Sequence, residues 1–163
     1  MNDLFQDSTK FMTGSWKPVR MRDIVGKIEE FLEDTDDYSI DIGTDSQNGQ
    51  STKFATVIAV HKIGKGGIFF YHSLKVDKIH TFYDRIYRET AMSIECASKL
   101  LELFLDRELL RDITIHCDVG PNGKTKHMIR EITGYVNSSG FECKIKPEGT
   151  VAYTIADKFC KSA

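Results

Sequence analysis

The sequence predicts one α/β domain in which three antiparallel strands precede alternating helices and strands. Three observations indicate this fold class. Apolar and polar residues alternate from Tyr38 to Asp45, as they do in a strand, and residues 53–62 and 67–76 form two more segments typical of strands. Apolar residues recur at helical spacing between residues 81 and 106. Shorter strand and helix patterns then alternate to the C-terminus, so we expect a five-stranded mixed sheet with helices on both faces.

The first 36 residues precede this core. Residues 1–18 lack periodicity and are expected to form an irregular arm. Apolar residues from Met21 to Leu32 recur every three or four positions, which predicts an amphipathic helix that ends in the acidic turn at residues 33–37. Residues 37–163 then form the core of a single domain that spans residues 1–163, a length within the usual size for one hydrophobic core.

The elements of the core alternate in type and are joined by turn signals such as Asn48-Gly49 and Gly64-Lys65-Gly66. Strands are expected at Tyr38 to Asp45, Lys53 to Lys62, Gly67 to Val76, Ile113 to Cys117 and Phe141 to Ile145. Helices are expected at about Thr81 to Asp106, Lys124 to Asn137 and Tyr153 to Lys161. Gly140 is well placed to end the second of these helices.

Composition narrows the class of protein. Apolar residues make up 40% of the chain and charged residues 28%, which is ordinary for a soluble globular protein. No segment approaches the roughly 20 consecutive apolar residues that span a bilayer, and the N-terminus does not resemble a secretory signal. The four cysteines lack CxxC spacing, which favours reduced thiols over zinc ligands or disulfides. We therefore expect a cytoplasmic protein with no membrane partner.

Charge is unevenly distributed along the chain. The net charge is -2, but residues 1–50 hold 5 basic and 11 acidic side chains, whereas residues 121–163 hold 7 basic and 4 acidic ones. A basic region beside an acidic one could seat a phosphate backbone next to a metal ion. A mixed solvated surface explains the same distribution equally well.

Four acidic residues occupy distinctive places in the predicted order of elements. Asp45 ends the first strand, Glu89 lies in the first half of the long helix, Asp118 follows the fourth strand, and Asp157 lies in the final helix. Clustered carboxylates repel one another unless they share protons or a cation. Mg²⁺ or Mn²⁺ would relieve that repulsion and could activate water against a phosphodiester.

Each acid also has a purely structural interpretation. Asp118 precedes a Gly-Pro-Asn-Gly loop and could be a turn former. Glu89 could pair with Arg85 at four-residue spacing on a solvated helix face, although Glu89 borders the apolar stripe. Asp41 lies on the same strand face as Asp45, so either could be the acid of the first strand. We favour Asp45, because ligands bind at the carboxyl ends of strands in open α/β sheets.

Taken together, these residues resemble the ribonuclease H-like superfamily. The segment GTDSQ, from Gly43 to Gln47, is similar to its first-strand motif, and IADKFCK, from Ile155 to Lys161, is similar to its last helix. The segments HCDVGPNGKTK and CKIKPEGTVAYTIADK more narrowly resemble the bacterial YkuK-like family. The resemblance implies a ribonuclease H-like fold in which Asp45, Glu89, Asp118 and Asp157 are catalytic metal ligands for Mg²⁺ or Mn²⁺.

Other motifs carry weaker signals. The segment GPNGKTK imitates a phosphate-binding loop, but Asp118 replaces its first glycine, which argues against a nucleotide site. The candidate contacts to nucleic-acid phosphates are Lys124, Lys126 and Lys158. His80 is a better candidate than His116 for reaching a site, since His116 lies within a strand. The aromatic residues Phe69, Phe70, Tyr71, Phe82, Tyr83 and Tyr87 are expected to pack in the core rather than to stack on bases.

The sequence therefore predicts a metal-dependent nuclease that hydrolyses phosphodiester bonds of RNA, DNA or a hybrid. The alternative is a nucleic-acid-binding or protein-interaction module that keeps the fold without catalysis, because a fold does not guarantee its chemistry. An ATP-using protein of the actin-like group is disfavoured, because one copy of the fold lacks the paired domains that enclose a nucleotide.

Overall fold

The computed structural model describes residues 3–148. Its strands are β1 (Lys10–Thr13), β2 (Pro18–Arg20), β3 (Tyr38–Asn48), β4 (Ser51–Lys62), β5 (Gly66–Asp77), β6 (Thr114–His116) and β7 (Glu142–Lys144). Its helices are α1 (Met21–Phe31), α2 (Phe82–Asp106) and α3 (Ile129–Ser138), and a single 3-10 turn, η1 (Lys126–Met128), precedes α3. The predicted helix from Tyr153 to Lys161, with Asp157 and Lys158, lies outside the described residues.

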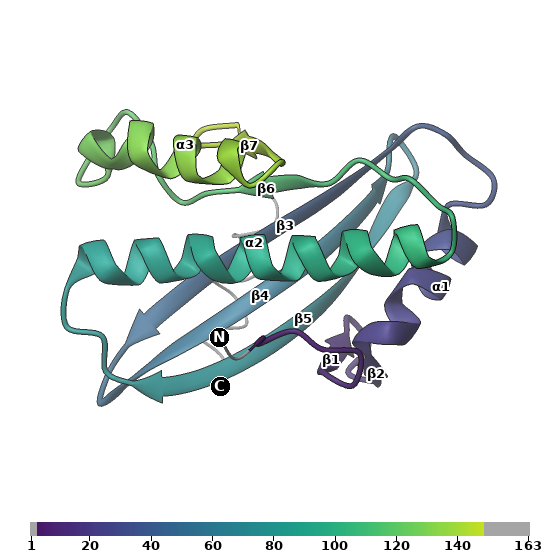
Figure 1. The fold of residues 1–163 in the computed structure, drawn as a ribbon, viewed down its shortest axis with the longest axis horizontal. Coiled ribbons are helices and arrows are strands. Elements are labelled where there is room, and N and C mark those ends of the chain that lie inside the picture. The colour runs from purple at the N-terminus through teal and green to yellow at the C-terminus, as the bar shows by residue number, and fades with distance from the viewer. Residues whose placement is uncertain (1–2, 149–163) are drawn as a thin grey trace.

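The described strands form one mixed sheet in the order β2-β1-β5-β4-β3-β6-β7 (Figure 1). The long strands β3, β4 and β5 form an antiparallel meander, whereas β6 runs parallel to β3 and β7 runs parallel to β6. The predicted mixed sheet is therefore confirmed. The sheet changes from antiparallel to parallel pairing at β3.

The prediction of five strands is wrong, because the N-terminal segment adds two more. β1 pairs antiparallel with β5 through Met12 and Thr13, and β2 pairs antiparallel with β1. Phe11 is fully buried in this hairpin. With four and three residues, these strands are too short to show a clear alternation, so the sequence indicated an irregular arm.

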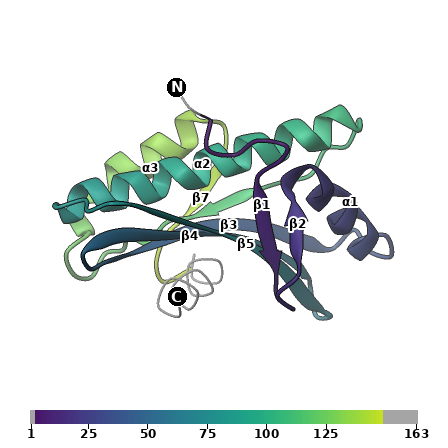
Figure 2. The ribbon, with the colours of Figure 1, turned by 90° about the horizontal axis from the view of Figure 1, so that it is seen from below.

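Helix α2 packs across the meander and buries the main core. Its first turn is capped by Thr81, whose hydroxyl accepts a hydrogen bond from the Asp84 backbone N–H at 3.1 Å. In its middle, the Ser93 hydroxyl lies 2.8 Å from the hydroxyl of Thr44 on β3. Figure 2 shows α2 and α3 on the same side of the sheet. The sequence predicted helices on both faces of the sheet. Because the predicted helix from Tyr153 to Lys161 lies outside the described residues, this part of the prediction is not tested.

Several element boundaries differ from the prediction. β3 continues to Asn48 rather than ending at Asp45. The helix expected from Lys124 begins later, because the Gly120 backbone N–H is bound by the Thr125 hydroxyl at 3.0 Å and the chain stays in a loop there. Gly140 follows α3 with a φ of 94°, as expected for a glycine that ends a helix. None of the described helices is long and apolar enough to cross a membrane.

Candidate metal centre

Two of the predicted acids are brought together by the parallel pairing of β3 and β6. Gly43 on β3 lies opposite His116 on β6. Two residues further along each chain are Asp45 and Asp118, so both carboxylates stand at the same end of neighbouring strands. Helix α2 crosses this region and contributes Glu89. The order of strands and helices along the chain therefore brings Asp45, Asp118 and Glu89 to one place.

The three carboxylates form a compact group. One oxygen from each of Asp45, Glu89 and Asp118 lies within 4.8 Å of the others. Asp45 is 9% exposed and Glu89 only 5%, while Asp118 is partly buried. Glu89 is therefore not a solvated helix residue, and the alternative that it pairs with Arg85 on an open face is wrong. The structure brings three of the four predicted acids together; their catalytic and metal-binding roles stay predictions.

The surroundings of Glu89 disfavour the ionised form of its carboxyl group. The pKa of Glu89 is raised well above its ordinary value, chiefly because the carboxyl group is buried. The charge of Asp45 raises it further, and that of Asp118 adds to the effect. A hydrogen bond from Ser46 and the charge of Arg85 act in the opposite direction. A cation placed among these oxygens would reverse the balance.

Ser46, which the sequence analysis did not select, orients Glu89 and is itself bound by Arg85. The Ser46 hydroxyl donates a hydrogen bond to Glu89 Oε2 at 2.5 Å. Arg85 Nη1 in turn donates to the Ser46 hydroxyl at 3.3 Å. Ser46 follows Asp45 directly, so one strand supplies both an acid and the group that orients its neighbour. Its position beside Asp45 was visible in the sequence, but its partner on α2 was not.

Another residue that was not predicted to be in the site is Lys146. Its ammonium group forms an ion pair with Asp118 Oδ1. The chain around Lys146 is held against the loop after β6, since its backbone N–H donates to the Val119 carbonyl at 2.9 Å. A Cβ atom at Gly120 would lie 2.8 Å from Cβ of Lys146, so only glycine permits this approach. No local sequence signal links these two segments.

Asp41, the other candidate on the first strand of the meander, belongs to a different contact. Its Oδ1 lies 3.0 Å from Nε2 of His116, and its Oδ2 accepts a hydrogen bond from the Ser39 hydroxyl at 3.0 Å. The structure thus pairs Asp41 with a buried histidine and places Asp45 with the other acids. This geometry favours Asp45 as the acid of the cluster.

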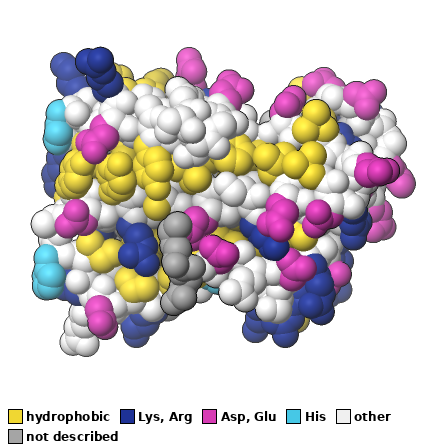
Figure 3. All heavy atoms as spheres, in the orientation of Figure 1, with side chains coloured by type: hydrophobic (Ala, Val, Ile, Leu, Met, Phe, Trp, Pro, Cys, Tyr) yellow, Lys and Arg dark blue, Asp and Glu magenta, His cyan; other side chains and the backbone are white. Residues whose placement is uncertain are grey.

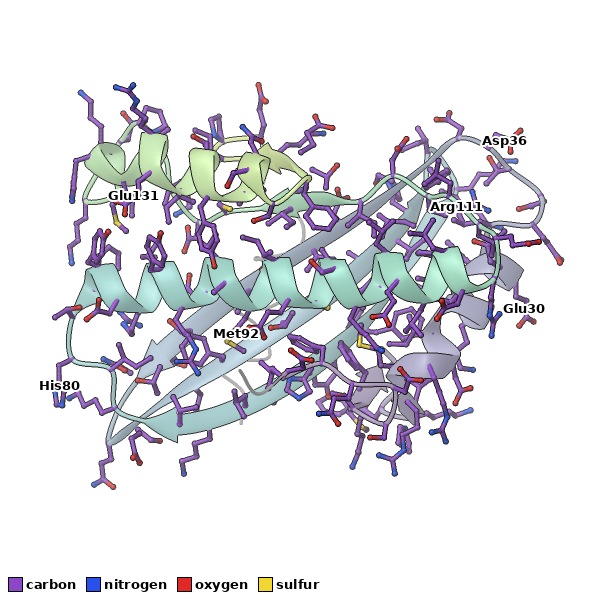
Figure 4. All side chains as sticks on the ribbon, viewed as in Figure 1. Glu30, Asp36, His80, Met92, Arg111 and Glu131 are labelled. Atoms are coloured by element: carbon purple, nitrogen blue, oxygen red, sulfur yellow. The ribbon has the colours of Figure 1, made fainter. Side chains whose placement is uncertain are left out.

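The other described candidates, two lysines and two histidines, are not members of the carboxylate cluster. Lys124 lies with its ammonium group 5.3 Å from the centre of the Phe82 ring, and Lys126 is exposed in η1. His80 is exposed in the connection before α2 (Figure 4). His116 is buried in β6, as expected. Neither histidine is part of the carboxylate group.

The expectation that the aromatic residues pack in the core is only partly correct. Phe70 and Tyr71 are buried, but Phe82 is 38% exposed and Tyr83 is 42% exposed. Both lie in the first turn of α2. Helical spacing alone could not show that these two side chains of the first turn are exposed.

The chemistry of the donor set suits a hard divalent cation. Asp45, Glu89 and Asp118 offer only carboxylate oxygens, which are the ligands that Mg²⁺ and Mn²⁺ prefer, and two of the three side chains are buried. Such a cation would offset the mutual repulsion of the three groups. The cluster could therefore bind a divalent metal.

The α/β fold and the acidic cluster agree with the match to known families. The chain matches the ribonuclease H-like family over residues 23–161 and belongs to that family. It is 34% identical over 170 aligned positions to a protein of Bacillus subtilis strain 168 described as uncharacterized protein YkuK. That alignment covers 95% of this chain and 99% of the relative. No solved structure shows a significant match.

Proposed function

We propose that this chain is a divalent-metal-dependent nuclease that hydrolyses phosphodiester bonds in RNA, DNA or a hybrid of the two. The observation that carries the proposal is the group of three carboxylates, two of them buried, with oxygens within 4.8 Å of one another. Membership of the ribonuclease H-like family makes a nucleic acid the expected substrate class.

Each residue of the cluster would have a distinct role in the reaction. Asp45, Glu89 and Asp118 would hold the metal, and Asp157, in the segment that resembles the last helix of the superfamily, would complete the set. When bound, Mg²⁺ or Mn²⁺ would polarise the phosphate and lower the pKa of an attacking water. Ser46 keeps the Glu89 carboxyl oriented through its hydrogen bond.

Positive groups near the cluster would receive the substrate. Lys124 and Lys126 lie in the segment after Asp118, and Lys158 lies beside Asp157 in the sequence. Contacts from lysines to phosphate oxygens position a nucleic acid without reading its bases. The proposed division is therefore between carboxylates that act on the phosphodiester and lysines that hold the backbone.

Replacing Asp118 by Asn tests the nuclease proposal. The purified chain is incubated with labelled RNA, DNA and hybrid probes in Mn²⁺ and in chelator. We expect metal-dependent cleavage of at least one probe. Loss of a residue that only supports a metal ligand already costs about 10–100-fold, so we expect a loss of about 100-fold or more in Asp118→Asn, in which an amide replaces a charged ligand. Asp106→Asn is the matched control, since Asp106 is exposed at the opposite end of α2. Equal cleavage by wild type and Asp118→Asn would contradict the proposal.

One observation favours the second candidate, a module that binds nucleic acid without cleaving it. The Lys146 ammonium group pairs with Asp118 and supplies a positive charge at the place where a metal would bind. If this lysine serves as the permanent counter-ion, probes should bind equally well in chelator and in Mn²⁺, and all of them should stay intact. The same set of probes therefore separates the two functions.

A further inference from the structure

Phe82 is a partly exposed aromatic residue whose ring lies against two cations. It is the first residue of α2 and is 38% exposed. The Arg85 guanidinium carbon lies 5.6 Å from the ring centre, and the Lys124 ammonium group lies 5.3 Å from it. Arg85 comes from the same helix, whereas Lys124 comes from the loop that follows Asp118. The two segments that supply metal-site acids thus also meet at this ring.

The ring is connected to the carboxylate cluster by direct contacts. Arg85, which lies against Phe82, donates a hydrogen bond to Ser46 at 3.3 Å, and Ser46 donates one to Glu89 at 2.5 Å. A polynucleotide whose phosphate reached the acids would therefore carry its neighbouring bases close to Phe82. Figure 3 shows hydrophobic side chains gathered in a band on the face of the molecule that carries α2.

The neighbouring tyrosines are already engaged with one another. The ring centres of Tyr83 and Tyr87 are 5.8 Å apart, and those of Tyr87 and Tyr135 are 5.1 Å apart, both in stacked geometry. The Tyr83 hydroxyl donates a hydrogen bond to Glu131 at 2.5 Å, and Figure 4 shows Glu131 on α3. Phe82 instead has the Arg85 and Lys124 cations over its ring. When these cations turn toward the phosphates of an incoming strand, the ring is open to a base, whereas the tyrosines stay stacked on one another.

We propose that Phe82, with Arg85 and Lys124, is a stacking site for an unpaired base of single-stranded nucleic acid entering the carboxylate cluster. An aromatic face stacks on any base, and the two cations complement the phosphates on either side of it. A duplex keeps its bases stacked on each other and would gain little from the ring. This inference rests on the proposed nuclease function and adds single-stranded nucleic acid as its substrate class. A binding measurement tests it without any cleavage.

The experiment measures fluorescence anisotropy of labelled oligo-dT, oligo-rU and a DNA duplex of equal length with the full chain in chelator. We expect Phe82→Ala to weaken binding of single strands about tenfold and to leave the duplex unchanged, because one base loses its stacking partner. Phe82→Trp should restore the affinity. Trp16→Ala is the matched control, because Trp16 is a 65% exposed aromatic between β1 and β2, which form the edge of the sheet opposite β6 and β7. It should leave all affinities unchanged.

Three outcomes would overturn the stacking site: no binding of single strands by the wild type, equal losses for single strands and duplex in Phe82→Ala, or the same loss in Trp16→Ala. A preference for oligo-dT or for oligo-rU supports the site and identifies the strand as DNA or RNA. Because the assay contains chelator, it is independent of cleavage. A failed nuclease assay therefore leaves the stacking site standing, and the reverse also holds.

Discussion

Glu89 carries a carboxyl group whose charge is opposed by its surroundings, and this should appear in the pH dependence of stability. Its pKa is raised by burial, then by Asp45 and by Asp118. An unfolded chain ionises this group near the ordinary glutamate pKa of about 4.3. Above that pH the unfolded state releases a proton that the folded state keeps. The stabilising contribution of the protonated group is therefore complete in acid and is lost as pH rises through the raised folded pKa.

Glu89→Gln should remove this dependence, because the amide does not titrate while its oxygen can still accept the hydrogen bond from Ser46. In chelator, we expect the variant to gain stability relative to wild type as the pH rises from about 4 toward 8. Urea unfolding at several pH values measures the difference. Asp106→Asn, which alters an exposed acid, should show no such trend. A difference between Glu89→Gln and wild type that stays constant with pH would contradict the interpretation.

At the residue scale, the sequence predicted the acids better than their partners. Asp45, Glu89 and Asp118 could be placed from the order of strands and helices, because neighbouring strand ends meet at one edge. Ser46 and Lys146 could not be connected to the site in this way. Their contacts depend on how α2 and the segment after β7 approach that edge, and neither approach follows from local periodicity.

At the scale of elements, the β1–β2 hairpin is part of the folded core rather than an arm on its surface. Phe11 is fully buried, with ring centres 5.9 Å from Phe5 and 5.5 Å from His72. Phe11→Ala should therefore lower the free energy of unfolding by about 3–5 kcal/mol through lost burial and a cavity. Trp16→Ala changes an exposed residue of the same hairpin and should change stability by about 0.5 kcal/mol or less.

Urea unfolding of both variants decides the point. A cost below about 1 kcal/mol for Phe11→Ala would mean that the hairpin detaches easily from β5. The sequence could not reveal this contact, because the strands of the hairpin are short and β1 meets β5 through only Met12 and Thr13. The long strands of the meander, by contrast, offered 11 or 12 residues of pattern each and were predicted correctly as strands.

For the molecule as a whole, the decisive feature is the change of pairing at β3. The strand is antiparallel to β4 on one side and parallel to β6 on the other. The parallel pairing brings the ends of β3 and β6 together with their acids, and α2, which packs on the sheet, adds Glu89. The sequence predicted this arrangement because a meander followed by crossovers produces a mixed sheet. The site is thus a consequence of topology, and its metal affinity should be linked to folding.

Metal binding should consequently raise the stability of the entire molecule. A cation that binds only the folded chain adds about 2.7 kcal/mol at 100 times its Kd, which corresponds to a rise in Tm of about 5–10 °C for a chain of this size. We expect Mn²⁺ to produce such a rise in wild type and little or none in Asp118→Asn. Lys146→Met should show a larger rise at low Mn²⁺, because the ammonium group that pairs with Asp118 no longer competes with the metal. Thermal unfolding across a Mn²⁺ titration measures all three proteins. Asp106→Asn should follow wild type, and a rise in Asp118→Asn equal to that of wild type would place the bound metal elsewhere on the protein.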